Sequence, residues 1–162
     1  MFTGKRNSFY FKSNLSNPMK QKLNCIMLID DDEPTTFLSS IFIEEAGCTD
    51  NIQIADSAQK ALDYLRYGDE PTGKNNNHIH PDLIFLDINM PSMNGWEFLD
   101  KYKEMKKPQD ETIIIMLTTS LDPEDKIRAG NIPQIASFEH KPLTPEIINR
   151  ILNKHFSNLV LS

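Results

Sequence analysis

The segment LIFLDINMPSMNGWEFL, residues 83–99, gives the clearest indication of the fold. It opens with the continuous apolar run Leu83–Leu86, which is typical of a strand buried on both faces. Asp87 follows this run directly. After a short loop, apolar residues recur at helical spacing from Trp96 onward. The stretch therefore predicts a buried strand, an acidic strand end and a helix in immediate succession.

Short apolar runs recur on both sides of this stretch and alternate with helical patterns. Four further strands are predicted, at residues 25–29, 52–54, 113–117 and 135–138. Runs of this kind are typical of parallel strands, and the helices between them supply the crossover connections. The sequence therefore predicts an α/β fold with a doubly wound, five-stranded parallel sheet covered by helices on both faces.

The helices are predicted from capping residues and from the helical spacing of apolar residues. They are expected to begin near Pro34, Ser57, Trp96 and Thr144. The first of them is expected to present one apolar face, made of Phe37, Leu38, Ile41 and Phe42. A helix between residues 121 and 134 is expected to be short or irregular, because Gly130 and Pro133 interrupt it.

Length and composition limit the class of protein. The 162 residues fit one domain with a tail: residues 1–20 are polar and predict a mobile tail, and residues 21–158 are assigned to the folded domain. The net charge is −6, from 17 basic and 23 acidic side chains, which argues against binding to nucleic acid or anionic membranes. No apolar run approaches the ~18 residues of a membrane-spanning helix. Two cysteines without metal or redox spacing favour a cytoplasmic location.

Polar side chains with chemical potential follow four of the five predicted strands. They are Asp30 and Asp31 after the first strand, Asp87 after the third, Thr118 after the fourth and Lys141 after the fifth. In open parallel sheets, ligands bind beyond the carboxyl ends of the strands, where the strand order switches direction. With the order 2-1-3-4-5, the second strand lies at one edge, and it is the strand that contributes no such residue.

Asp30, Asp31 and Asp87 are therefore expected to converge. Two carboxylates about 4 Å apart repel each other by ~4 kcal/mol at an effective dielectric constant of about 20. A hard divalent cation such as Mg²⁺ relieves that repulsion and keeps a coordination position open for a phosphoryl oxygen. The Thr118 hydroxyl and the Lys141 ammonium can contact the other phosphoryl oxygens. This set of groups is suited to phosphoryl transfer onto an aspartate.

With these residues in place, the sequence resembles the receiver domain of two-component response regulators. The resemblance spans residues 23–156. Four segments carry it: LIDDDEP (28–34), LIFLDINMPSMNGWEFL (83–99), IIIMLTTS (113–120) and FEHKPLTPE (138–146). The long predicted loop at residues 68–80 and the lack of an output domain are similar to the stand-alone, single-domain members of this family.

The resemblance implies the flavodoxin-like receiver fold and a phosphoacceptor function. Asp87 would accept a phosphoryl group from the phosphohistidine of a histidine kinase or of a histidine phosphotransfer protein. Asp31 and Asp87 would bind Mg²⁺ directly, Asp30 would bind it mainly through water, and the backbone carbonyl of Asn89 would supply a further ligand. The protein would be a signalling phosphoacceptor with slow autodephosphorylation rather than a conventional enzyme.

The resemblance also implies a conformational switch that acts on a protein partner. Thr118 and Lys141 match the switch hydroxyl and the switch lysine of the family, and the Lys141–Pro142 peptide bond is often cis there. Phe138 occupies the position of the family's aromatic switch, although a plain core role is equally compatible with the sequence. Trp96 is equally open to two interpretations, packing or contact with a kinase helix.

One enzymatic alternative fits the acidic cluster. A magnesium-dependent phosphohydrolase would use Asp87 as a covalent nucleophile. Such enzymes commonly carry a second aspartate two residues later as the general acid. That position is Asn89 here, which cannot supply a proton in this way. The phosphoacceptor is therefore the preferred interpretation.

Overall fold

Five strands form one parallel sheet in the order β2-β1-β3-β4-β5, as predicted. The computed structural model describes residues 21–67, 78–105 and 111–157, so the predicted tail (1–20) and most of the predicted loop at 68–80 lie outside the described residues. The strands are β1 (Ile26–Ile29), β2 (Ile52–Ala55), β3 (Leu83–Asp87), β4 (Ile113–Thr118) and β5 (Ile135–His140). The three central strands β1, β3 and β4 are almost entirely buried.

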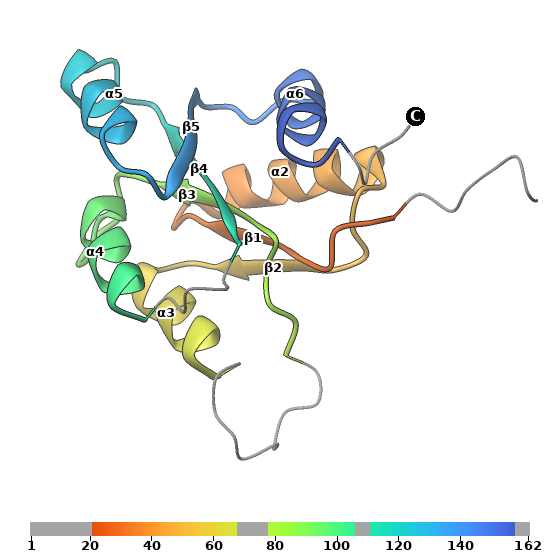
Figure 1. Cartoon of the computed structure of the whole chain (residues 1–162), viewed down its shortest axis with the longest axis horizontal. Helices are drawn as coiled ribbons and strands as arrows, with labels where there is room; N and C mark the ends of the chain where they lie inside the picture. Colours follow the sequence, from red (N-terminus) through yellow and green to blue (C-terminus); the bar gives the residue numbers. More distant parts are fainter. Residues whose placement is uncertain (1–20, 68–77, 106–110, 158–162) are drawn as a thin grey trace, which may run out of the picture.

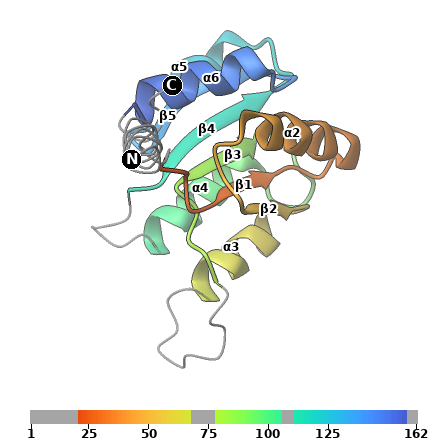
Figure 2. The same cartoon turned by 90° about the vertical axis from the view of Figure 1, so that its right-hand side faces the viewer.

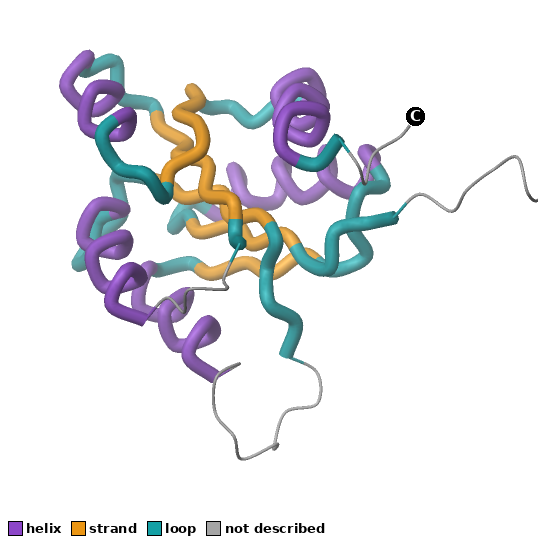
Figure 3. Tube along the Cα trace, in the orientation of Figure 1, coloured by secondary structure: helices purple, strands orange, loops and turns teal. Residues whose placement is uncertain are grey.

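Helices cover both faces of this sheet (Figures 1 and 3). They are α2 (Glu33–Ala46), α3 (Ala58–Tyr67), α4 (Gly95–Met105), α5 (Pro123–Gly130) and α6 (Pro145–His155). Helices α2 and α6 pack on one face and α3 and α4 on the other (Figure 2). Each face has its own apolar core. Ala129 of α5 joins the core beneath α3 and α4.

Capping residues explain where three of these helices begin. Asp32, Asp122 and Thr144 lie at N-cap positions, and their side chains accept hydrogen bonds from backbone N–H groups of the first turn. A proline follows each cap within the first helical turn, where its missing N–H costs nothing. Helix α5 is short, as expected, and ends at Gly130. Within the described ranges, no helix has the length and apolar composition needed to span a bilayer.

The predicted apolar face of the first helix was partly wrong. Phe37 and Leu38 of α2 are 66% and 43% exposed, whereas Thr36, Ser39 and Ile43 are buried against the sheet. Thr36 and Ser39, which have small side chains, line a small cavity there together with Asp30 and Asp87. The Thr36 hydroxyl is satisfied there by donating to the Glu33 carbonyl at 2.9 Å. Close packing near the site therefore overrides the apolar periodicity of the sequence.

The buried cysteines provide a first test of this core. Both thiols are free and buried, and burial, helped by the charge of Asp82, raises the pKa of Cys25 from 9.0 to about 11. Neither thiol should react with Ellman's reagent at pH 8 in the native protein, and both should react in urea. Because the folded state keeps the Cys25 proton to higher pH, the free energy of unfolding should fall by about 1.4 kcal/mol per pH unit between pH 9 and about 11. A reaction of both thiols in the absence of urea would contradict this description of the core.

Candidate functional site

Three aspartates meet where β1 and β3 end. Ile29 pairs with Leu86 across the two strands, so the residues that follow, Asp30 and Asp87, come level with each other. Asp30, Asp31 and Asp87 each offer a carboxylate oxygen, and these oxygens lie within 4.8 Å of one another. Asp30 and Asp87 are buried, while Asp31 is exposed at the mouth of the cluster. Three converging carboxylates, one of them open to solvent, form a donor set that suits a hard divalent cation.

Lys141 brings a positive charge into the same cluster. Its Nζ lies 2.5 Å from Asp30 Oδ2 and 3.3 Å from Asp87 Oδ1, and its side chain is 13% exposed. The Lys141 backbone N–H donates to the Thr118 carbonyl at 2.8 Å, which fixes the end of β5 against β4. The peptide bond between Lys141 and Pro142 is cis. A side chain from the fifth strand therefore pairs with carboxylates at the ends of the first and third strands.

The electrostatics of the cluster raise the pKa of Asp87 and keep Lys141 charged. Burial, and next the neighbouring Asp30 carboxylate, raise the pKa of Asp87 above its ordinary value, although Lys141 opposes them. Burial alone would lower the pKa of Lys141, but its hydrogen bond to Asp30 and the charges of both carboxylates raise it overall. Lys141 is therefore held as an ammonium, which stabilises the ionised form of Asp87 at neutral pH.

Backbone groups complete the surroundings of the two buried carboxylates. Asp30 Oδ1 accepts a hydrogen bond from the Asp32 N–H at 3.0 Å, and Asp87 Oδ1 accepts one from the Asn89 N–H at 3.3 Å. Asn89 itself is exposed at the start of the loop that follows β3. Local turns at the strand ends therefore orient both carboxylates before any ligand binds.

The loop after β3 returns tightly to the end of that strand. The Gly95 N–H donates to the Ile88 carbonyl at 2.8 Å, and a Cβ at position 95 would lie 2.6 Å from the Asp87 carbonyl oxygen. Only glycine fits this approach. Ser92 has a φ of +66°, a strained value for a residue with a side chain. The geometry of this loop, and thus of Asp87, depends on these two positions.

The structure places Thr118 at the neighbouring strand end and Phe138 on the outer strand. Thr118 is fully buried, and its Oγ1 accepts a hydrogen bond from the Ser120 N–H at 2.8 Å. Phe138 is half-buried against the core beneath α3 and α4, and its ring meets the His140 ring edge-on. Thr118 is thus hydrogen-bonded to the segment that leads into α5, and Phe138 packs partly in the core.

Trp96 shows a partner that the sequence did not predict. Its indole is buried in the core beneath α3 and α4, and the Arg128 guanidinium carbon lies 4.4 Å from the ring centroid. The packing interpretation of Trp96 is therefore the one that the structure supports. Arg128 had no signal in the sequence, because it comes from a different helix and lies 32 positions away in the chain.

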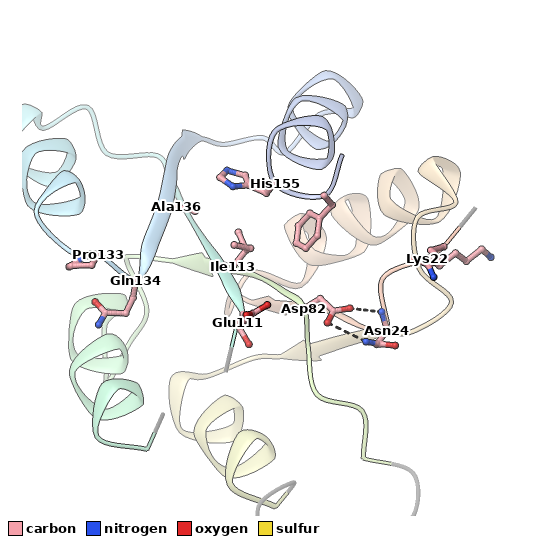
Figure 4. A pocket seen from close by; sticks show the side chains of 12 residues that line it. Lys22, Asn24, Asp82, Glu111, Ile113, Pro133, Gln134, Ala136 and His155 are labelled. Carbon is pink, nitrogen blue, oxygen red and sulfur yellow. Dashed lines mark hydrogen bonds between the residues drawn. The ribbon is translucent and has the colours of Figure 1, made fainter. Parts of the chain in front are cut away.

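A large groove lies at the opposite end of the sheet from the acidic cluster (Figure 4). It has a volume of about 970 Å³ and is lined at the amino ends of the strands by residues that include Asn24, Asp82 and Gln134. The Asp82 carboxylate accepts two hydrogen bonds from Asn24 there, one from the backbone N–H at 2.6 Å and one from the side-chain amide at 3.3 Å. Burial lowers the pKa of His155 beside this groove. None of the predicted site residues lines it.

Comparison with known proteins points to one family. A family model described as the response regulator receiver domain matches residues 26–153. A crystal structure of a two-component response regulator from Cytophaga hutchinsonii is 32% identical, covers 85% of this chain and 99% of that chain, and superposes with a TM-score of 0.73.

Curated relatives agree with this match and differ in size. The probable methanogenesis regulatory protein FilR2 of Methanothrix harundinacea is 26% identical over 80% of this chain and 79% of its own length. Hybrid signal transduction histidine kinase C of Dictyostelium discoideum is 27% identical over 80% of this chain, but the match spans only 10% of that much longer protein. The shared unit is therefore the α/β domain, in proteins of very different overall size.

Proposed function

The chain belongs to the response regulator receiver domain family of two-component systems, and from this premise we propose that Asp87 is its phosphoacceptor. The phosphoryl donor is the phosphohistidine of a histidine kinase or of a histidine phosphotransfer protein. The phosphorylated domain, which we assign to residues 21–158, then signals to a protein partner in the cytoplasm.

The observation that carries this proposal is the buried ion-paired cluster at Asp87. Among the described residues, Asp87 is the carboxylate that ends the central strand β3 and lies within reach of both Asp30 and Lys141. A structural role alone does not explain three converging carboxylates with one lysine, because their mutual repulsion weakens the fold. A bound cation and an incoming phosphoryl group account for all four side chains.

The reaction needs an ionised nucleophile and compensation of phosphoryl charge. One Asp87 oxygen attacks phosphorus as the phosphorus–nitrogen bond of the donor histidine breaks, and the imidazole leaves with the bonding electron pair. Lys141 favours the ionised form of Asp87 and can then pair with a phosphoryl oxygen. Asp31 and Asp87, with Asp30 through water and the Asn89 carbonyl, would hold Mg²⁺. When bound, this ion neutralises charge on the transferring oxygens.

The switch residues are proposed on the same grounds. The Thr118 hydroxyl is buried at the end of β4, where it can turn from the Ser120 N–H toward a phosphoryl oxygen. Lys141 can move its charge from Asp30 to the new phosphoryl group. Phe138 lies half-buried on the outer strand, where a change at Thr118 can alter its packing. These three residues would convert the chemistry at Asp87 into a change of surface.

The phosphohydrolase alternative finds less support. Its general acid would lie two residues after the nucleophile, and Asn89 holds that position with an amide that cannot protonate a leaving group. The site residues thus favour an acceptor that keeps its phosphoryl group long enough to signal.

Phosphorylation by a small donor tests the proposed function directly. Incubation of the full chain with acetyl phosphate and Mg²⁺ should add about 80 Da, the mass of one phosphoryl group, as measured by intact mass spectrometry. Removal of Mg²⁺ with EDTA should abolish the adduct, because the carboxylate cluster then repels the anionic donor. Equal labelling in EDTA would argue against a metal-assisted site, and a failure to label with Mg²⁺ would argue against the proposed function.

A further inference from the structure

A contact between two helices joins the region of the acceptor to the outer surface. Trp96, the second residue of α4, is 7% exposed, and the guanidinium of Arg128 from α5 lies over its ring at 4.4 Å. Tryptophan is the aromatic residue that binds a cation most strongly, and burial of the ring strengthens the attraction. We call this contact between Arg128 and Trp96 the α4–α5 latch.

The α4 side of the latch is fixed to the acceptor loop. Gly95, which precedes Trp96, donates its N–H to the Ile88 carbonyl and packs directly against the Asp87 backbone. The rest of the loop is capped by reciprocal hydrogen bonds between Asn94 and Glu97. Trp96 therefore keeps its place relative to Asp87 with little freedom.

The α5 side is held much more weakly. Among the side chains of α5, only Ala129 is buried. Ile127 is 64% exposed, and Leu121, which lies just before the helix, is 86% exposed. An element with so few buried contacts has a low free energy of local displacement. In Figure 1, α5 lies at the outer corner of the molecule beside α4 and β5. The latch is therefore one of the contacts that hold α5 in place, together with buried Ala129 and the packing of α5 against β5.

The amino end of α5 is connected to the buried Thr118 hydroxyl. Thr118 Oγ1 accepts from the Ser120 N–H at 2.8 Å, and the Ser120 hydroxyl accepts from the Asp122 N–H at 3.1 Å. Asp122 then caps the helix by accepting from the Glu124 N–H at 3.0 Å. A rotation of Thr118 would break the first link of this chain. The two ends of α5 are therefore tied to the site by different contacts.

We propose that the α4–α5 latch holds α5 in its resting position and thereby opposes phosphorylation of Asp87. This inference rests on the proposed function, because it needs Thr118 to turn toward a phosphoryl group. That turn releases the amino end of α5, and Arg128 resists the movement from the other end. Coupling of this kind is reciprocal, so weakening the latch must also strengthen binding at the phosphoryl site.

The test uses the single tryptophan of the full chain as the probe. Beryllofluoride with Mg²⁺ serves as the phosphoryl mimic, and Trp96 fluorescence reports binding. Arg128→Gln should shift the emission of the free protein to longer wavelength, because it uncovers the indole. It should also lower the dissociation constant for beryllofluoride about two- to five-fold, the range expected for loss of a partly exposed cation–π contact.

Matched variants separate the latch from charge and from folding. Lys126→Gln removes the same charge from an exposed position on the same helix and should leave both readouts as in the wild type. Arg128→Lys keeps a cation without the planar group and should fall between the wild type and Arg128→Gln. Circular dichroism confirms that each variant is folded. The affinity is decisive, because a merely structural cover on Trp96 would change the emission alone.

Two results would overturn the latch. One is an unchanged dissociation constant in Arg128→Gln, and the other is weaker binding, which would mean that the contact favours the phosphorylated arrangement. A different set of results is expected if the proposed phosphoacceptor function itself is wrong. In that case the wild type shows no fluorescence response to beryllofluoride and no acetyl phosphate adduct, while Arg128→Gln still shifts the emission of the free protein.

Discussion

Asp87→Asn protein is expected to gain no phosphoryl group from acetyl phosphate under conditions that label the wild type. The amide has the shape of the carboxylate but lacks the charged oxygen that attacks phosphorus. Asp87 is also one of the three carboxylates of the cluster, so the substitution weakens cation binding at the same time. Intact mass spectrometry measures the loss as disappearance of the adduct of about 80 Da.

Asp56→Asn is the matched control for this loss. Asp56 directly follows β2, as Asp30 follows β1, but β2 lies at the edge of the sheet, away from the cluster. Its carboxylate is exposed and pairs with Lys60 at 2.7 Å. This variant should label as well as the wild type. If Asp87→Asn also labelled normally, the acceptor would have to be another residue.

Asp87→Asn should also make the metal-free protein more stable at neutral pH. Burial, and then the charge of Asp30, raise the pKa of Asp87 in the folded state, so folding holds its proton more tightly than the unfolded chain does. The stability contributed by this group therefore falls as the pH rises through the interval between the two pKa values. Asparagine removes the repulsion between Asp87 and Asp30 and leaves Lys141 with Asp30. Urea unfolding in EDTA would show the gain, and a lower midpoint would contradict it.

The sheet could be predicted because its strands are short apolar runs buried on both faces. The outer strand β5 extends to His140, two residues beyond its predicted end. Its last residues are polar because the strand lies at an edge of the sheet. Glu139 there accepts from the Ser137 hydroxyl at 2.7 Å and pairs with Arg150 of α6 at 2.5 Å. An analysis of apolar patterns misses the end of this strand, because its polar side chains are stabilised by hydrogen bonds and an ion pair rather than by apolar burial.

The convergence of the acidic residues followed from topology alone. Parallel strands bring their carboxyl ends to one edge of the sheet, so residues at strand ends far apart in sequence must meet there. Contacts between helices have no comparable rule. Arg128 over Trp96 depends on how α5 settles beside α4, and the exposure of Phe37 depends on how α2 is rotated about its axis. Both are set by side-chain packing, which periodicity in one segment does not record.

Gly95→Ala is expected to cost about 1–3 kcal/mol of stability, the usual penalty for forcing an extra methyl group into a packed site. Its Cβ would lie 2.6 Å from the Asp87 carbonyl oxygen and 3.0 Å from the Ile88 Cα. Both neighbours are backbone atoms, so no side chain can rotate away to make room. The acceptor strand end must therefore move, and labelling of Asp87 by acetyl phosphate should slow as well. Urea unfolding and the rate of adduct formation measure the two effects.

Gly130→Ala makes the same chemical change where there is space for it. Gly130 ends α5, and a Cβ there would meet nothing within 4 Å. Alanine also restricts the unfolded chain, so this variant should be more stable than the wild type by about 0.4–1 kcal/mol. The difference between the two variants isolates the steric contact at Asp87 from the general effect of replacing glycine. If Gly95→Ala unfolded at the same urea concentration as Gly130→Ala and labelled at the wild-type rate, the loop after β3 would not control the position of the acceptor.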